Sequence, residues 1–143
     1  MKNYKKFKLQ VVKGKKEYYQ VFIFNDRMNM RLFSMELLKR LKVDKMEAAT
    51  HSFKAYRTVD DKEVESDMIG AILFYKGGFG HGVVSHEIAH AVNYYFLRKK
   101  IGFNLAKAND AWVGADETYA TILGYMVNQF WKKHNGKVGK ERY

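Results

Sequence analysis

Residues 84–95 carry apolar side chains at the spacing that an α-helix gathers on one side. They occupy positions i, i+4, i+7, i+8 and i+11, and they are Val84, Ile88, Ala91, Val92 and Tyr95. With about 3.6 residues per turn, such positions form one continuous stripe that can be buried against a core. The spacing therefore predicts a long helix that runs to about Lys100 and stops at Gly102.

The segments around this helix predict an α+β fold. A hairpin is expected over residues 7–24, strands over 49–59 and 69–75, and helices over 28–41 and 116–133. We expect a small, mostly antiparallel sheet packed on the helix of residues 84–100 and on a second, C-terminal helix. The 143 residues contain neither Pro nor an internal repeat, so we expect one domain over residues 1–143, with flexible basic ends at 1–6 and 134–143.

Composition limits both chemistry and location. The chain has no Cys, so a disulfide framework or a thiolate zinc finger is excluded, and any metal must use His and carboxylate ligands. The basic N-terminus lacks the apolar run of a secretory signal. No apolar run reaches the length of about 18 residues that a membrane-spanning helix needs. We therefore expect a cytoplasmic protein without membrane contact.

The informative motif is Ser85-His86-Glu87-Ile88-Ala89-His90, which has the pattern His-Glu-x-x-His. Residues four apart project from the same side of a helix, so the imidazoles of His86 and His90 can converge on one zinc ion. Glu87 stands beside them and can take a proton from a water on the metal. Ordinary packing or pairing of the two His is the alternative, but the apolar stripe already gives this helix a separate core face.

A catalytic zinc site needs a third protein ligand and an open position for water. The candidates after the motif are Asp110, Asp116, Glu117 and His134. Glu117 is preferred, because the small residues that follow it predict close packing of the second helix on the first; these are Ala120, Thr121 and Gly124. Asp116 is the next candidate, although it projects about 100° away from Glu117.

The two segments His86-Glu87-Ile88-Ala89-His90 and Asp116-Glu117-Thr118-Tyr119-Ala120 together resemble the zincin metallopeptidases, in their gluzincin branch. The likeness covers residues 69–131 and extends to minimal metallopeptidase-like proteins of phages and prophages. It implies a zincin-like fold and a Zn²⁺ ion held by His86, His90 and Glu117. It also implies that Glu87 is the general base and acid in the hydrolysis of a peptide or protein substrate.

Other branches of these enzymes fit less well. The segment after His90 lacks the Gly and the third His of metzincins. SprT-like proteases usually carry a third His and a Cys-rich module, and nothing here corresponds to the helix-turn-helix partner of ImmA/IrrE-type peptidases. Zincins lay their substrate as an extra strand along a sheet edge, for which residues 69–75 are the expected neighbourhood. The donor that stabilises negative charge on the substrate has several candidates: His81, Tyr94, Tyr95, Tyr119 and Tyr125.

The formal net charge of +11 leaves other functions open. Residues 1–16 contain seven Lys and no acid, and a second basic segment begins at Lys132. One alternative is a nucleic-acid-associated protein whose zinc is structural or which directs a protease to DNA, with weak polyanion contact through the basic ends. Another is an inactive zincin that only binds a partner. The sequence does not specify the oligomeric state.

Overall fold

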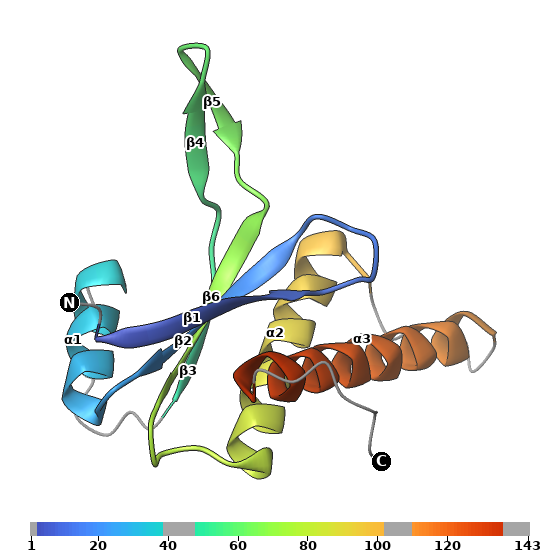
Figure 1. The fold of residues 1–143 in the computed structure, drawn as a ribbon. Coiled ribbons are helices and arrows are strands. Elements are labelled where there is room, and N and C mark those ends of the chain that lie inside the picture. The colour runs from blue at the N-terminus through green and yellow to red at the C-terminus, as the bar shows by residue number, and fades with distance from the viewer. Residues whose placement is uncertain (1–2, 39–47, 102–109, 136–143) are drawn as a thin grey trace.

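The computed structural model describes residues 3–38, 48–101 and 110–135. The elements follow one another as β1 (Tyr4–Gln10), β2 (Tyr18–Phe24), α1 (Arg27–Leu38), β3 (Ala49–Ser52), β4 (Tyr56–Val59), β5 (Lys62–Glu65), β6 (Met68–Tyr75), α2 (His81–Lys99) and α3 (Asp110–His134) (Figure 1). The expected α+β class is confirmed, because three helices in this part of the chain accompany a small sheet.

Four strands form one mixed sheet in the order β1-β2-β6-β3. β1 and β2 make the predicted antiparallel hairpin, with Gly14 at φ 83° in the turn, and β3 pairs antiparallel with β6. β2 and β6 run parallel, which the sequence did not predict. Parallel neighbours need a crossover, and the chain supplies it by passing through α1 and β3 before β6 begins. β6 is therefore a central strand, and β3 is the edge of the sheet next to α2.

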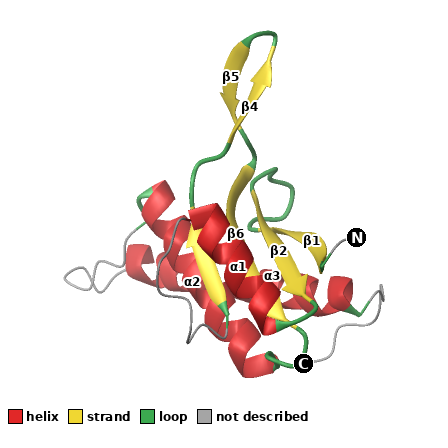
Figure 2. Cartoon of the chain, turned by 90° about the vertical axis from the view of Figure 1, so that its left-hand side faces the viewer, coloured by secondary structure: helices red, strands yellow, loops and turns green. Residues whose placement is uncertain are grey.

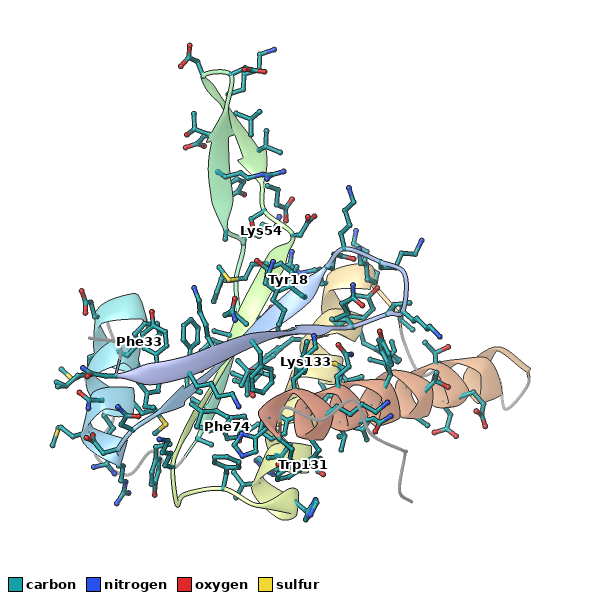
Figure 3. All side chains as sticks on the ribbon, viewed as in Figure 1. Tyr18, Phe33, Lys54, Phe74, Trp131 and Lys133 are labelled. Atoms are coloured by element: carbon teal, nitrogen blue, oxygen red, sulfur yellow. The ribbon has the colours of Figure 1, made fainter. Side chains whose placement is uncertain are left out.

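Helices cover both faces of this sheet. Ile72 and Phe74 of β6 point to the core shared with α2 and α3, whereas Ala71 and Leu73 point to a second core with Met30 of α1. Burial on both faces explains why residues 69–74 are apolar without alternation. Figure 3 shows Phe33 on α1, at one face of the sheet, and Phe74 on the side of α2 and α3.

The expected strand over residues 49–59 is divided between two sheets. Ser52 pairs with Gly70 near the start of β6, so the residues that follow run past the end of their partner strand. The chain then leaves the sheet and forms the β4–β5 hairpin, which projects away from the body (Figure 2). Its tight turn holds Asp60 and Asp61 at φ 50° and 61°, the left-handed geometry that two-residue hairpin turns require. The sequence analysis missed this hairpin.

The remaining boundaries differ modestly from expectation. α2 ends at Lys99, where Lys100 adopts a left-handed cap with φ 57°, and the expected stop at Gly102 lies outside the described residues. α3 is longer at its start than predicted. Of the ends expected to be flexible, residues 4–6 belong to β1 and His134 closes α3, while residues 1–2 and 136–143 lie outside the described residues. No helix in the described ranges is long and apolar enough to cross a membrane.

Candidate metal centre

α2 separates a buried face from an exposed one. The predicted stripe is buried as expected, with Ile88 fully enclosed between the sheet and α3. His86 and His90 lie two residues to either side of Ile88, and both are exposed. Since two residues correspond to about 200° of rotation, both imidazoles point away from the core and are about 40° from each other. The helix thus presents two imidazoles to the surface from a rigid, buried support.

The two imidazoles already have nearly the separation that zinc requires. Nε2 of His86 and Nε2 of His90 lie 3.1 Å apart, with ring centroids 4.7 Å apart. Two nitrogens bound at about 2.0–2.1 Å to one tetrahedral zinc would lie about 3.3 Å apart. The ligand atoms of His86, Glu87 and His90 all fall within 4.8 Å of one another. In the described ranges, this is the one group of three or more His or acidic side chains close enough to hold a metal.

Glu87 differs from its neighbours because its side chain is buried. Only 7% of the residue is exposed, and a carboxylate removed from water needs a polar partner. Thr50 of β3 supplies it: its Oγ1 lies 2.9 Å from Oε1 and 2.8 Å from the main-chain oxygen of Glu87. The other carboxylate oxygen, Oε2, lies 3.8 Å from Nε2 of His86. The carboxylate therefore bridges the sheet edge and the imidazole pair.

Glu117 is exposed on α3 and does not join this group of ligand atoms in the described structure. The face of α3 turned to α2 is marked by Tyr119, whose hydroxyl donates to the Ala89 main-chain oxygen over 3.3 Å. Glu117 comes two residues before Tyr119 and projects about 160° away from that face, whereas Asp116 projects only about 60° away. Asp116 is also exposed and also outside the group.

The expectation for the small residues of α3 is corrected. Ala120, Thr121 and Gly124 are exposed, and the helix packs instead through larger side chains: Tyr119, Ile122, Met126 and Phe130. These positions repeat at intervals of three and four, so burying them turns the small residues to the outside. His134 packs its ring against Phe130 and Phe79 at the far end of α3, and the side chain of Asp110 lies outside the described part.

Among the candidate oxyanion donors, Tyr94 has a ring contact with the imidazole of His90. Its ring stacks at 6.4 Å on that of His90, one helical turn away. Tyr125 donates to Gln10, and His81 contacts Trp131 at 4.5 Å between ring centroids. Burial raises the pKa of Tyr119, which keeps its hydroxyl protonated as a donor, but that hydroxyl is engaged by Ala89.

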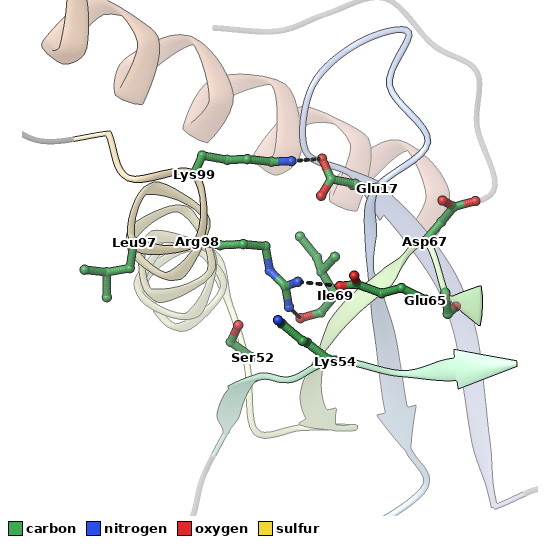
Figure 4. Close-up of a pocket in the computed structure, with 10 residues that line it drawn as sticks. Glu17, Ser52, Lys54, Glu65, Asp67, Ile69, Leu97, Arg98 and Lys99 are labelled. Atoms are coloured by element: carbon green, nitrogen blue, oxygen red, sulfur yellow. Dashed lines mark hydrogen bonds and ion pairs between the residues drawn. The ribbon is translucent and has the colours of Figure 1, made fainter. Parts of the chain in front are cut away.

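A hollow lies at the C-terminal end of α2, where the β4–β5 hairpin joins the body (Figure 4). Its volume is about 720 Å³, and charged side chains already paired with each other form much of its wall. Arg98 donates to the Phe53 main-chain oxygen at 2.6 Å and pairs with Glu65 at 3.2 Å, and Lys99 pairs with Glu17 at 2.8 Å. The Arg98 contacts fasten the base of the hairpin to α2, and the Lys99 pair fastens α2 to the residue that precedes β2.

Thr50 is the functional candidate that the sequence analysis missed. It is 37 positions from Glu87, and no local spacing connects the two residues. Comparison with known proteins adds no assignment: no family model matches this chain, and no significant match was found among curated proteins or solved structures.

Proposed function

We propose that this protein is a zinc-dependent metallopeptidase with a zincin-like active centre. The observation that carries the proposal is the 3.1 Å separation of the two Nε2 atoms of His86 and His90, with the carboxylate of Glu87 in the same group. Two imidazoles four residues apart on one helix are ligands that zinc favours, and their spacing needs little adjustment to hold it. We assign His86 and His90 as ligands and Glu87 as general base and acid.

A zinc ion held by His86 and His90 would serve as the Lewis acid for the scissile carbonyl and would lower the pKa of water. Glu87 takes a proton from the attacking water while the oxygen of that water adds to the carbonyl carbon. As the C–N bond breaks, Glu87 delivers that proton to the leaving amine. Oε2 is the oxygen suited to this exchange, because Oε1 is already held by Thr50.

The substrate is a polypeptide laid along β3 rather than along β6, which is enclosed between two other strands. Within the described residues, β3 is the last strand of the sheet and pairs with β6 alone, and an edge strand is where a further strand can add. The strand also contacts Glu87 through Thr50, so a peptide paired with β3 would pass close to the metal-binding side chains. This arrangement supports hydrolysis of extended peptide segments.

The third zinc ligand is proposed to come from α3. Glu117 remains the predicted residue, and Asp116 is the competitor because it lies on the flank nearer to α2. Both side chains are exposed and free of any described ion pair, so neither would have to give up a buried partner to reach a metal.

Metal content tests the proposal directly. The purified protein should hold one zinc per chain, and His86→Ala should hold none while keeping the circular dichroism of the wild type. Glu117→Ala and Asp116→Ala are a matched pair, and the variant that loses zinc identifies the third ligand. If the wild type takes up no zinc when it is supplied, the metal centre is refuted. Zinc without turnover of any unstructured peptide would instead favour an inactive zincin that binds a partner.

A second candidate function, polyanion binding, is favoured by the way the two basic segments meet. Lys133 of α3 donates to the Lys8 main-chain oxygen at 2.5 Å, and Lys5 donates to the His134 main-chain oxygen at 2.6 Å. Burial, and then the charge of Lys8, lower the pKa of Lys133. Cations from both segments therefore crowd one surface, where nucleic-acid phosphates would relieve their repulsion.

A further inference from the structure

Thr50 makes the closest polar contact to the buried carboxylate of Glu87. The antiparallel register places Thr50 opposite Ile72 in β6, so its position on the sheet is fixed by main-chain pairing. Its hydroxyl lies 2.9 Å from Oε1 and 2.8 Å from the main-chain oxygen of the same glutamate. One hydroxyl proton is thus shared between two acceptors of Glu87, which ties the carboxylate to its own main chain.

The two oxygens of this carboxylate have different surroundings. Oε1 is held by Thr50, while Oε2 is directed toward the imidazole pair and lies 3.8 Å from Nε2 of His86. A side chain with three rotatable bonds would otherwise sample several positions. The hydroxyl therefore selects the orientation in which the second oxygen faces the place where a peptide and a water would react.

We infer that Thr50 is a positioning residue, which holds the Glu87 carboxylate in the orientation needed for proton transfer. The inference rests on the proposed function, and it adds a residue from the edge strand to a site otherwise built on α2. If Thr50 only satisfied the buried carboxylate, removing its hydroxyl would leave the turnover of bound substrate unchanged. If Thr50 positions the carboxylate, removing the hydroxyl lowers kcat.

The test uses variants that separate shape from hydrogen bonding. Thr50→Val keeps the shape and removes the hydroxyl, and Thr50→Ser keeps the hydroxyl. Thr50→Ala is a second hydroxyl-free variant should the valine fail to fold. Ser52→Ala is the matched control, because Ser52 lies two residues along the same strand, on the same face, and no described hydrogen bond joins it to Glu87.

The first measurement is the position of the Glu87 carboxylate in crystal structures of these variants without metal. One position is expected in the wild type, Thr50→Ser and Ser52→Ala, and a displaced or divided carboxylate in Thr50→Val. An unchanged carboxylate in Thr50→Val overturns the inference. This measurement needs no activity, so it decides the question even if the wild type proves not to be a peptidase.

The second measurement is zinc-dependent hydrolysis of an unstructured fluorogenic peptide. Thr50→Val should lower kcat by about 10- to 100-fold while zinc content and KM stay within about twofold of the wild type, because misplacing a catalytic group costs rate rather than binding. Thr50→Ser should recover most of the loss. A wild-type rate in Thr50→Val, or an equal loss in Thr50→Ser, overturns the positioning role. A wild type without any zinc-dependent hydrolysis refutes the proposed function instead.

Discussion

Glu87 holds its carboxylate on the buried side of α2, while the imidazoles of His86 and His90 beside it are exposed. We expect Glu87→Gln to bind zinc as the wild type does, since the imidazoles are untouched, and to lose about 10²- to 10⁴-fold in hydrolysis, since the amide cannot take a proton. Zinc content and peptide turnover should be measured on the same sample. His86→Ala is the control that loses both, and undiminished zinc-dependent turnover in Glu87→Gln would refute the proton-transfer role.

Tyr19 links the sheet to α2 through a fully buried hydroxyl, which donates to the Ala91 main-chain oxygen at 3.1 Å. Burial raises the pKa of Tyr19 from 10.0 to about 12. Below pH 10 the phenol is neutral in both folded and unfolded chains, but from pH 10 to 12 only the unfolded chain ionises. Stability is therefore present below pH 10 and lost as the pH rises toward 12, by about 1.4 kcal/mol per pH unit at most.

Tyr19→Phe should flatten this alkaline loss relative to the wild type, and should lower stability at pH 7 by about 1 kcal/mol through the lost hydrogen bond. Urea unfolding at pH 7, 10 and 11 measures both effects. The control is Tyr56→Phe, because Tyr56 is 57% exposed and its substitution should leave the pH dependence unchanged. Equal pH slopes for Tyr19→Phe and the wild type would contradict the assignment.

Among the elements, β3 and β6 pack tightly at Gly70, which pairs with Ser52. A Cβ atom there would collide with the His51 main-chain oxygen and with the ring of Tyr19. Gly70→Ala should therefore destabilise the protein by about 1–3 kcal/mol and shift β3, which carries Thr50. Gly124→Ala is the control, since no atom outside α3 lies within 4 Å of its added Cβ. This variant should be more stable to unfolding than the wild type by about 0.5–1 kcal/mol. Thermal unfolding of the pair tests this, and equal stability of the two variants would contradict it.

Elements with a local signal were predictable from the sequence, and elements defined by distant partners were not. The apolar stripe of residues 84–95 predicted α2 and placed His86 and His90 off its core face, because helix periodicity is local. The division of residues 49–59 into β3 and β4 depends on where β6 begins, which no spacing within the segment records. The prediction of which side of α3 is buried was wrong for the same reason, since that side is determined by packing against α2 and the sheet.

At the scale of the whole molecule, the acidic residues of the hairpin lie apart from the lysines of β1 and α3. The β4–β5 hairpin, which projects from the body in Figure 1, carries four acidic residues, namely Asp60, Asp61, Glu63 and Glu65. The lysines of β1 and the end of α3 meet elsewhere, joined by the contact between Lys133 and Lys8. The net charge of +11 left attraction to polyanions open as an alternative, but the sequence could not show that segments 125 residues apart share one surface.

This arrangement makes the location of any nucleic-acid contact testable. The variant Lys5→Ala/Lys8→Ala/Lys133→Ala removes three charges from the β1–α3 surface, and Lys54→Ala/Arg57→Ala/Lys62→Ala removes three from the hairpin and its base. Both lower the net charge equally. If duplex DNA binds the β1–α3 surface, the slope of log K against log salt should fall by up to about 3 in the first variant only, because each lost phosphate contact contributes about 0.9. An equal fall in both variants would mean that attraction follows net charge alone. Negligible binding of the wild type near physiological salt would mean that these lysines form a solvated surface. The metal centre would then be the one candidate site among the described residues.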